Sequence, residues 1–317
     1  MPPKNIAAID MGTNSFHLVV AELKKKDSFK IIDREKEIIR LGSHKGEALN
    51  LISKEETSKA IEVLRRFKQL ASYYDAPIRA VATSAVREAF NRNDFIDAVK
   101  ENTGIHVEVI DGHKEANLIY LGAKKALEIS DKRVLCIDIG GGSTEFVLGD
   151  NSHPAFAESI KIGAVRLTRK YFRGYILFSE HINECADYIE EAITSNKNIC
   201  LNEHIELAVG SSGTVQSIAS MVSYLRNGVL IKNINGFSFT AEEFFKIAEI
   251  VLNKRTPRER MTIGGLEAKR ADIIPAGVLI LKKIFEMFNL KSMTVSEYAL
   301  REGIILDMIA NKDLYFK

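Results

Sequence analysis

Short apolar runs, broken by glycine-rich segments, occur at two corresponding places along the chain. Residues 9–20 read IDMGTNSFHLVV and residues 137–148 read IDIGGGSTEFVL, and each segment follows a further apolar run. An apolar run, a glycine-rich break and a second apolar run are typical of a strand–turn–strand hairpin. Because both copies share Ile-Asp-x-Gly-x-x-Ser in the same register, the sequence predicts two hairpins and a duplicated architecture.

Outside the hairpins the pattern alternates between strands and helices. Ser53 followed by Glu56 forms a capping box, which predicts a helix that begins there and runs to about Tyr74. Strands that alternate with helices imply an α/β fold whose sheets are covered by helices. The further elements expected are strands over 78–83, 106–110, 207–209 and 292–295, and helices over 84–102, 114–129, 241–252, 271–288 and 298–310.

Composition describes an ordinary globular protein. A length of 317 residues favours two domains over one, and a formal charge of +2 gives no reason to expect binding to nucleic acid or to a membrane. No apolar run reaches the length of about 18 residues that suggests a membrane span, and the N-terminus lacks a secretory apolar region. Cys136, Cys185 and Cys200 form no CxxC pair, which predicts reduced, buried thiols and favours a cytoplasmic location.

The two predicted turns carry the first candidate chemistry. Asp10 and Asp138 each end a strand, and glycines in the following turns let backbone amides form a concave anion site. An acid beside an anion site implies a divalent cation, and Mg²⁺ is commonly held by one or two carboxylates with phosphate oxygens and water. A plain tight hairpin is the alternative for either turn alone, but the matching register favours Mg²⁺–phosphate recognition. The expected phosphate-binding residues are Gly12, Thr13, Asn14, Ser15, Gly140, Gly141, Gly142 and Ser143.

A third segment of small residues, Gly210-Ser211-Ser212-Gly213-Thr214, follows the strand expected at 207–209 and precedes an apparent helix. A strand, a loop of small residues and a helix N-terminus can bind phosphate through free amides and the helix dipole. The segment matches neither the Walker A pattern nor GxGxxG, which disfavours P-loop and Rossmann folds. Its candidate phosphate-binding residues are Gly210, Ser212, Gly213 and Thr214.

Glu115 and Glu145 are the candidate carboxylates for activating water. Glu145 lies two residues after Ser143, on the same face of the expected strand. Glu115 lies early in a helix, where an acid that favours the helix dipole is the simpler interpretation. A carboxylate near a phosphoryl group can deprotonate an attacking water. The histidines show no metal-ligand spacing, so a zinc site is not expected.

Several basic residues could bind phosphate, but each also has a simpler interpretation. Arg87 follows a strand end and could clamp phosphate, whereas a surface ion pair with Glu88 or another acid is the simpler alternative. Exposed charge at a helix start is the simpler interpretation of Arg270. Solvated charge is likewise the simpler interpretation of a cluster formed by Lys254, Arg255, Arg258 and Arg260.

Taken together, the motifs resemble the exopolyphosphatase/guanosine pentaphosphate phosphohydrolase family of the actin-like superfamily. The resemblance covers essentially the whole chain and depends on the order and spacing of its motifs. These motifs are Asp10-Met-Gly-Thr-Asn-Ser15, Ala82-Thr-Ser-Ala-Val-Arg87-Glu-Ala89, Glu115-Ala-Asn-Leu-Ile-Tyr120, Asp138-Ile-Gly-Gly-Gly-Ser-Thr-Glu145, Gly210-Ser-Ser-Gly-Thr214, Arg270-Ala-Asp272 and Ala299-Leu-Arg-Glu-Gly303.

The resemblance implies two actin-like, ribonuclease H-like α/β domains with a cleft between them. Domain I would cover residues 1–120, with a C-terminal helix at 299–317 packing back on it, and domain II would cover 121–298. The implied reaction releases terminal phosphate from polyphosphate, or converts guanosine pentaphosphate to tetraphosphate, with Mg²⁺ or another divalent cation. Glu115 would be the base, Glu145 would assist it or bind metal with Asp10 and Asp138, and Arg87 and Arg270 would bind phosphate.

The chain departs from the family in two ways. Lys114 stands where family members often carry a glutamate, and the His-Asp helical extension of longer members does not follow residue 317, which argues against processive handling of long polyphosphate. An actin-like ATPase or kinase, and a non-catalytic alarmone or polyphosphate sensor, are the alternative functions. The sequence leaves open the preferred phosphoanhydride and the oligomeric state, with a homodimer as one option.

Overall fold

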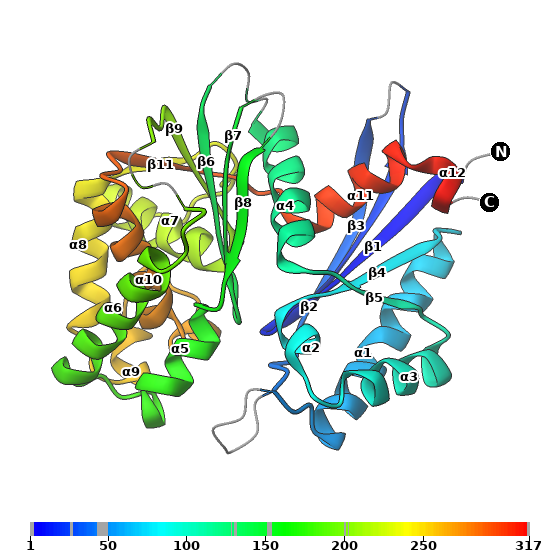
Figure 1. Cartoon of the computed structure of the whole chain (residues 1–317), viewed down its shortest axis with the longest axis horizontal. Coiled ribbons are helices and arrows are strands. Elements are labelled where there is room, and N and C mark those ends of the chain that lie inside the picture. Colours follow the sequence, from blue (N-terminus) through cyan, green and yellow to red (C-terminus); the bar gives the residue numbers. More distant parts are fainter. Residues whose placement is uncertain are drawn as a thin grey trace. The chain divides into compact units, whose positions relative to one another are not determined.

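A computed structural model describes residues 3–25, 28–42, 50–127, 129, 132–150, 154–199, 201 and 203–315. The chain divides into two compact units. Unit 1 comprises Met1–Gly122 and Leu300–Lys317, and unit 2 comprises Ala123–Ala299. Each unit is a mixed sheet covered by helices, as Figure 1 shows.

The sheet of unit 1 has the strand order β3-β2-β1-β4-β5. Neighbouring strands among β1, β2 and β3 are antiparallel, whereas β4 runs parallel to β1 and β5 parallel to β4. The expected hairpin at 9–20 is therefore present as β1 and β2. The strands are β1 (Asn5–Met11), β2 (Ser15–Leu23), β3 (Phe29–Ile38), β4 (Ile78–Ala82) and β5 (Val107–Val109).

Helices cover this sheet because its strands bury apolar residues on both faces. In β1, Ala7, Ile9 and Met11 pack into a core with α1 and α3. The alternate residues point to the other face, and α11 packs against β1 and β2. The helices of unit 1 are α1 (Lys54–Tyr73), α2 (Ser84–Glu88), α3 (Arg92–Thr103), α11 (Leu300–Ala310) and α12 (Lys312–Tyr315), and α4 (Gly112–Leu127) continues into unit 2.

The sheet of unit 2 has the order β10-β11-β9-β6-β7-β8. Its strands are β6 (Val134–Ile139), β7 (Thr144–Gly149), β8 (Pro154–Ile160), β9 (Leu207–Ser211), β10 (Ser238–Thr240) and β11 (Ser292–Val295). Its helices are α5 (Ala164–Tyr171), η1 (Arg173–Tyr175), α6 (Ser179–Thr194), α7 (Ser212–Asn227), α8 (Ala241–Leu252), α9 (Pro257–Arg260), η2 (Ala268–Arg270) and α10 (Ile274–Met287).

The two units share one topology. In unit 2, β8-β7-β6-β9-β11 repeats the order and the strand directions of β3-β2-β1-β4-β5, and β10 adds an antiparallel edge. The hairpin turns also match, because Gly12 N donates to Ser15 O at 3.2 Å and Gly140 N donates to Ser143 O at 2.9 Å. This repetition confirms the duplicated α/β architecture predicted from the two hairpin sequences.

The prediction of one continuous helix over 84–102 is wrong. The segment is broken into α2 and α3, and Ala89 between them has extended backbone angles. The side chain of Asn91 accepts from Ile52 N at 3.0 Å and donates to Ile52 O at 2.8 Å, while Phe90 N donates to Asn50 O. These bonds to a distant segment replace the bonds that a continuous helix would make.

The predicted boundaries of the small-residue loop at 210–214 are also wrong. Strand β9 continues through Gly210 and Ser211, in parallel register with Ile137 and Asp138 of β6, and α7 begins directly at Ser212. A side chain at Gly210 would collide with Met293 and Val215, so glycine is required there for packing. The helix expected from 271 begins at Ile274, because η2 occupies the preceding turn.

Other local predictions are confirmed. The capping box of Ser53 and Glu56 opens α1, with bonds of 2.9 and 3.1 Å. Cys136 and Cys185 are buried free thiols, and burial raises the pKa of both, to about 12 for Cys185. Cys200 lies outside the described residues. Within the described chain, every helix is too short or too polar to cross a lipid bilayer.

Candidate active site

The parallel strands of unit 1 bring three chain segments to one edge of the sheet. Thr83 N donates to Met11 O at 3.3 Å, and Ile110 N donates to Ala82 O at 3.2 Å. The segments after β1, β4 and β5 therefore leave the sheet side by side. Ligand sites of α/β proteins commonly lie at such carboxyl edges.

Arg87 and Glu115 meet at this edge. Arg87 Nη1 donates to Glu115 Oε2 at 2.8 Å and to Ile110 O at 3.0 Å, and the Glu115 side chain is almost fully buried. Glu88, the partner considered for Arg87 in the simpler interpretation, instead accepts from Ser84 at 2.8 Å. The structure thus pairs the expected phosphate-binding arginine with the expected base.

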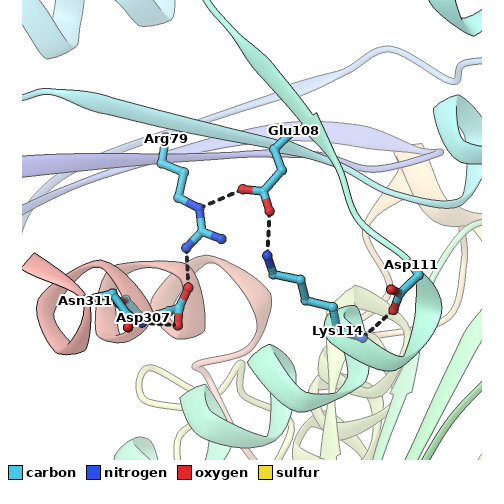
Figure 2. Close-up of polar contacts among 6 residues, drawn as sticks. All are labelled: Arg79, Glu108, Asp111, Lys114, Asp307 and Asn311. Atoms are coloured by element: carbon cyan, nitrogen blue, oxygen red, sulfur yellow. Dashed lines mark hydrogen bonds and ion pairs between the residues drawn. The ribbon is translucent and has the colours of Figure 1, made fainter. Parts of the chain in front are cut away.

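The start of α4 is fixed by a charged network in unit 1 (Figure 2). Arg79 Nε donates to Glu108 Oε2 at 3.0 Å, and Lys114 Nζ donates to Glu108 Oε1 at 2.6 Å. Arg79 also pairs with Asp307 of α11, and Asp111 Oδ1 accepts from Lys114 N at 2.8 Å. Burial raises the pKa of Glu108, but the bonds from Arg79 and Lys114 outweigh it and leave that pKa below its ordinary value. Lys114 therefore serves to anchor the turn that carries Glu115.

The first hairpin turn leaves polar side-chain atoms without partners. Asn14 O accepts from Ile39 N at 3.1 Å and from Arg40 N at 3.0 Å, which fixes the turn against the end of β3. The buried atoms Thr13 Oγ1 and Asn14 Oδ1 have no hydrogen-bond partner within the described residues. Buried polar atoms cost about 1–3 kcal/mol each when water or a ligand does not bind them, so the turn has polar atoms available to a ligand.

In unit 2, Asp138 and Glu145 lie directly opposite each other on β6 and β7. Side chains at opposed positions share one face of the sheet, and two like charges there are unfavourable without a counter-charge. Ser211 Oγ donates to Asp138 Oδ2, and Ser159 Oγ donates to Glu145 Oε1 at 2.7 Å. Two oriented carboxylates are suitable oxygen ligands for a divalent cation.

The described residues contain no group of three or more His, Cys, Asp or Glu side chains that could hold a metal. A cation between Asp138 and Glu145 would therefore need further ligands from phosphate oxygens and water. That ligand set fits Mg²⁺, which usually keeps several waters and binds through one or two carboxylates with substrate phosphate.

The start of α5 binds the backbone carbonyls of Gly140, Gly141 and Gly142 in the second hairpin turn. Ala164 N donates to Gly140 O, and Val165 N and Arg166 N donate to Gly141 O, at 2.9 to 3.0 Å. Arg166 Nε donates to Gly142 O at 2.6 Å. The amides of Gly141 and Gly142 have no acceptor among the described residues. Backbone amides without acceptors are what an anion-binding nest requires.

Gly163 is needed for this contact between the turn and α5. A Cβ at Gly163 would lie 2.5 Å from backbone atoms of Gly141 and Gly142, so a side chain there would displace the turn. Neither Gly163 nor Arg166 is singled out by the sequence motifs. An Ile-Gly pair after β8 is the only local signal that could have marked them.

The N-terminus of α7 forms a second positive feature of unit 2. Arg270 is only 9% exposed, and its one ion pair among the described residues is with Glu267 at 3.9 Å. A Cβ at Gly213 would overlap its guanidinium, which lies against the first turn of α7. Thr214 Oγ1 donates to Ile139 O at 3.3 Å and joins this turn to β6.

Arg270 is therefore not an exposed helix-start charge, and that simpler interpretation is wrong. Burial lowers the pKa of Arg270, and nearby Glu267 and Asp272 only partly offset this. A buried guanidinium beside the positive end of a helix dipole is a favourable site for an anion.

The interpretation of the basic cluster as solvated charge is wrong for Arg260. It is fully buried, and its guanidinium donates to the carbonyls of Ala271, Lys254, Arg255 and Tyr175. Burial lowers the pKa of Arg260 to about 10. Arg260 thus fixes the segment that carries Arg270, while Arg255 and Arg258 remain exposed.

The site residues predicted from the sequence divide between the two units. Asp10, Gly12–Ser15, Arg87 and Glu115 belong to unit 1. The remaining candidates, from Asp138 to Arg270, belong to unit 2. Their convergence on a single phosphoryl group stays a prediction.

Known proteins resemble the chain over nearly its whole length. A model of the Ppx/GppA phosphatase family matches residues 19–312. A Photobacterium profundum protein named guanosine-5'-triphosphate,3'-diphosphate pyrophosphatase is 32% identical over 314 residues, which cover 96% of this chain but 59% of that relative.

Solved structures agree with the family match. An exopolyphosphatase from Cytophaga hutchinsonii superposes with a TM-score of 0.88 at 28% identity, covering 96% of this chain and 98% of the other. The Ppx/GppA family member from Aquifex aeolicus superposes with a TM-score of 0.81 at 27% identity, covering 98% of each chain. The fold, the paired hairpin turns and these matches together show that the chain belongs to the Ppx/GppA phosphatase family.

Proposed function

We propose that the protein is a phosphohydrolase that releases terminal orthophosphate from inorganic polyphosphate, converts guanosine pentaphosphate to tetraphosphate, or does both. The observation that carries the proposal is the second hairpin, where opposed Asp138 and Glu145 lie beside the turn Gly140–Gly142, whose carbonyls are bound by α5. The names of the relatives, a pyrophosphatase acting on guanosine-5'-triphosphate,3'-diphosphate and an exopolyphosphatase, support both substrate classes.

Phosphoryl oxygens would be bound mainly by backbone amides of unit 2. The second hairpin turn presents the amides of Gly141 and Gly142, and the start of α7 presents those of Ser212 and Gly213. Thr214 N instead donates to Ser212 Oγ at 3.2 Å, and Arg270 adds a positive charge beside Gly213. Because β9 lies next to β6, with Ser211 opposite Asp138, the two amide sites occupy adjacent strand ends. Dipoles that are already fixed in place can stabilise the charge that develops in a transition state, because they do not need to reorganise.

Asp138 and Glu145 would hold Mg²⁺, and Asp10 is the corresponding acid of unit 1. When bound, the cation supplies Lewis-acid stabilisation of the phosphoryl oxygens. Ser211 and Ser159 orient the two carboxylates before any ligand arrives.

Glu115 would accept a proton from the water that attacks the terminal phosphorus. Its bond from Arg87 Nη1 fixes the carboxylate, and the described contacts of the Arg87 guanidinium involve Nη1 alone. A guanidinium has five N–H donors, so Arg87 can hold Glu115 and still donate to a phosphate oxygen. The same arginine would align the base and the phosphoryl group.

Glu115→Gln tests this assignment because it keeps the shape of the side chain and removes its basicity. Turnover should fall about 10²–10⁴-fold, the usual contribution of general-base catalysis. Binding of substrate should remain, and Glu101→Gln, an exposed acid on α3, serves as the matched control. Parental turnover in Glu115→Gln would remove Glu115 from the mechanism.

Phosphate release should be compared for tripolyphosphate, long polyphosphate, guanosine pentaphosphate and ATP. Release from ATP alone would favour an actin-like ATPase or kinase, and tight binding without release would favour a sensor. A cytoplasmic location and a homodimer are further predictions, and light scattering on the purified chain tests the second.

A further inference from the structure

Three polar side chains of unit 1 form a hydrogen-bonded chain that ends in the first hairpin turn. Arg301 Nη1, at the start of α11, lies 3.2 Å from His17 Nδ1. His17 Nε2 lies 2.8 Å from Ser15 Oγ. Ser15 and His17 are two residues apart on β2 and share one face of the sheet, the face against which α11 packs.

The direction of these hydrogen bonds follows from the chemistry of arginine. A guanidinium carries only N–H donors, so His17 Nδ1 must accept from Arg301. A neutral imidazole has one acceptor and one donor nitrogen, so Nε2 carries the hydrogen and donates to Ser15 Oγ. The Ser15 oxygen is thus an acceptor within the protein.

The hydroxyl hydrogen of Ser15 then has no acceptor among the described residues, although Ser15 is only 8% exposed. The same turn contains the buried hydroxyl of Thr13, whose Oγ1 also has no hydrogen-bond partner there. A donor directed away from its protein partner suits an anionic ligand.

We propose that Arg301 and His17 are positioning residues that orient the hydroxyl of Ser15 to donate to a phosphoryl oxygen. The inference depends on the proposed function for the identity of the anion, but the bond directions depend on geometry alone. A serine without such a neighbour can rotate its hydroxyl toward any acceptor. The Arg301–His17–Ser15 chain occupies one lone pair of Ser15 Oγ and so restricts the hydroxyl hydrogen to directions away from His17 before the ligand binds.

The duplicated hairpin of unit 2 lacks this arrangement. Glu145 takes the register position of His17, since it lies opposite Asp138 as His17 lies opposite Asp10. A carboxylate can only accept, and Glu145 accepts from Ser159 at 2.7 Å. The same scaffold therefore supplies an oriented donor in unit 1 and a second carboxylate in unit 2.

The bond directions can be measured without reference to activity. Nitrogen-15 NMR of histidine-labelled protein at pH 7.5, with His17 assigned by its loss in His17→Gln, should show the Nε2–H tautomer. Arg301→Met should shift His17 toward the Nδ1–H tautomer. An Nδ1–H tautomer in the parent, or a doubly protonated ring held by Asp10, would overturn the proposal.

Binding of tripolyphosphate in the presence of Mg²⁺, measured by calorimetry, tests the consequence. His17→Leu and Arg301→Met should each raise Kd about tenfold, which corresponds to ~1.4 kcal/mol. In a Ser15→Ala background the same substitutions should have no further effect, because the hydroxyl that they orient is absent. His17→Gln should bind better than His17→Leu, since an amide can accept from Arg301 and donate to Ser15.

Arg66→Met is the matched control, because Arg66 forms ion pairs with Glu35 and Glu37 on the surface of the same unit. Melting temperatures of all variants identify any loss of folding. Equal effects of His17→Leu with and without Ser15 would contradict the proposal. Binding of tripolyphosphate without hydrolysis would instead reject the proposed function and leave this inference standing. A parent that binds no tripolyphosphate would overturn the ligand assigned here.

Discussion

Asp138 and Glu145 occupy the same register positions in the second hairpin as Asp10 and His17 occupy in the first. The two hairpins also share the hydrogen bond that closes the turn. The two hairpins thus differ at the position opposite the aspartate. Of the two, only the second places two acids opposite each other. On the proposed function, the divalent cation would therefore be bound in unit 2, where the proposal can be tested.

The first prediction concerns the orientation of Glu145. Ser159→Ala removes the bond to Glu145 Oε1, and loss of such an outer ligand contact typically costs 10–100-fold in metal affinity or activity. The Mg²⁺ concentration for half-maximal phosphate release should therefore rise about tenfold. Ser238→Ala, in an exposed hydroxyl pair with Thr294 of the same sheet, should leave the requirement unchanged. An unaltered Mg²⁺ requirement in Ser159→Ala would argue against Glu145 as a ligand.

The second prediction concerns the contact of Gly163 with the glycine turn. In Gly163→Ala the new methyl group must displace the backbone of Gly141 and Gly142, at a cost of about 1–3 kcal/mol. Displacing the amides from the phosphoryl oxygens should lower turnover about 10²-fold. Steady-state rates and urea unfolding measure the two effects.

Gly174→Ala is the control for this substitution. Gly174 has a φ of 64° and open space around it, so alanine there should cost about 1 kcal/mol in stability but leave turnover unchanged. If Gly163→Ala behaved like Gly174→Ala, the turn would not depend on close packing with α5.

The third prediction separates two arginines of α9. Arg260→Met removes a buried guanidinium and leaves the carbonyls it binds without donors, so unfolding free energy should fall by about 3 kcal/mol or more. Arg258→Met, at an exposed position of the same helix, should change it by less than about 0.5 kcal/mol. Similar unfolding curves for the two variants would contradict the role assigned to Arg260.

The fourth prediction concerns stability in acid. The hydrogen bond from Arg226 lowers the pKa of Glu243 to about 2, from an ordinary value of 4.5. A depressed folded-state pKa stabilises the protein above pH 4.5, and this stabilisation is lost as the pH falls toward 2. Because the pair is partly exposed, Glu243→Gln should cost only about 1 kcal/mol at pH 7 and almost nothing near pH 2.

Urea unfolding of the parent and of Glu243→Gln between pH 7 and pH 2 measures this difference. Glu242→Gln, at an exposed position in the same helix turn, should differ from the parent by a few tenths of a kcal/mol. A constant difference between Glu243→Gln and the parent down to pH 2 would show that the charge of Glu243 is not responsible.

Local signals in the sequence were sufficient to predict much of the fold. The spacing of apolar residues, glycine-rich breaks and capping boxes are signals that depend only on neighbouring residues. The hairpins, α1, α8 and β11 could therefore be predicted closely. The break between α2 and α3 could not, because it depends on Asn91 binding the backbone of Ile52, which is distant in sequence.

The candidate site divides in the same way. Glu115, Asp138 and Glu145 lie in recognisable motifs, whereas Ser159, Gly163 and Arg166 act through contacts that form only when β8 and α5 pack on the hairpin. Arg260 looked like surface charge because nothing in its neighbourhood shows that backbone carbonyls will surround it.

The discontinuity of unit 1 has a consequence for biosynthesis. Helix α11 packs so closely on α4 that a Cβ at Gly303 would collide with the backbone of Leu118, and Asp307 pairs with Arg79. Unit 2 is contiguous in the order of synthesis, whereas unit 1 cannot complete its core until residues 300–310 have been made. The segment made first therefore lacks part of its own core until all of unit 2 has been synthesised, and nascent chains stalled before residue 300 should expose that incomplete core to chaperones.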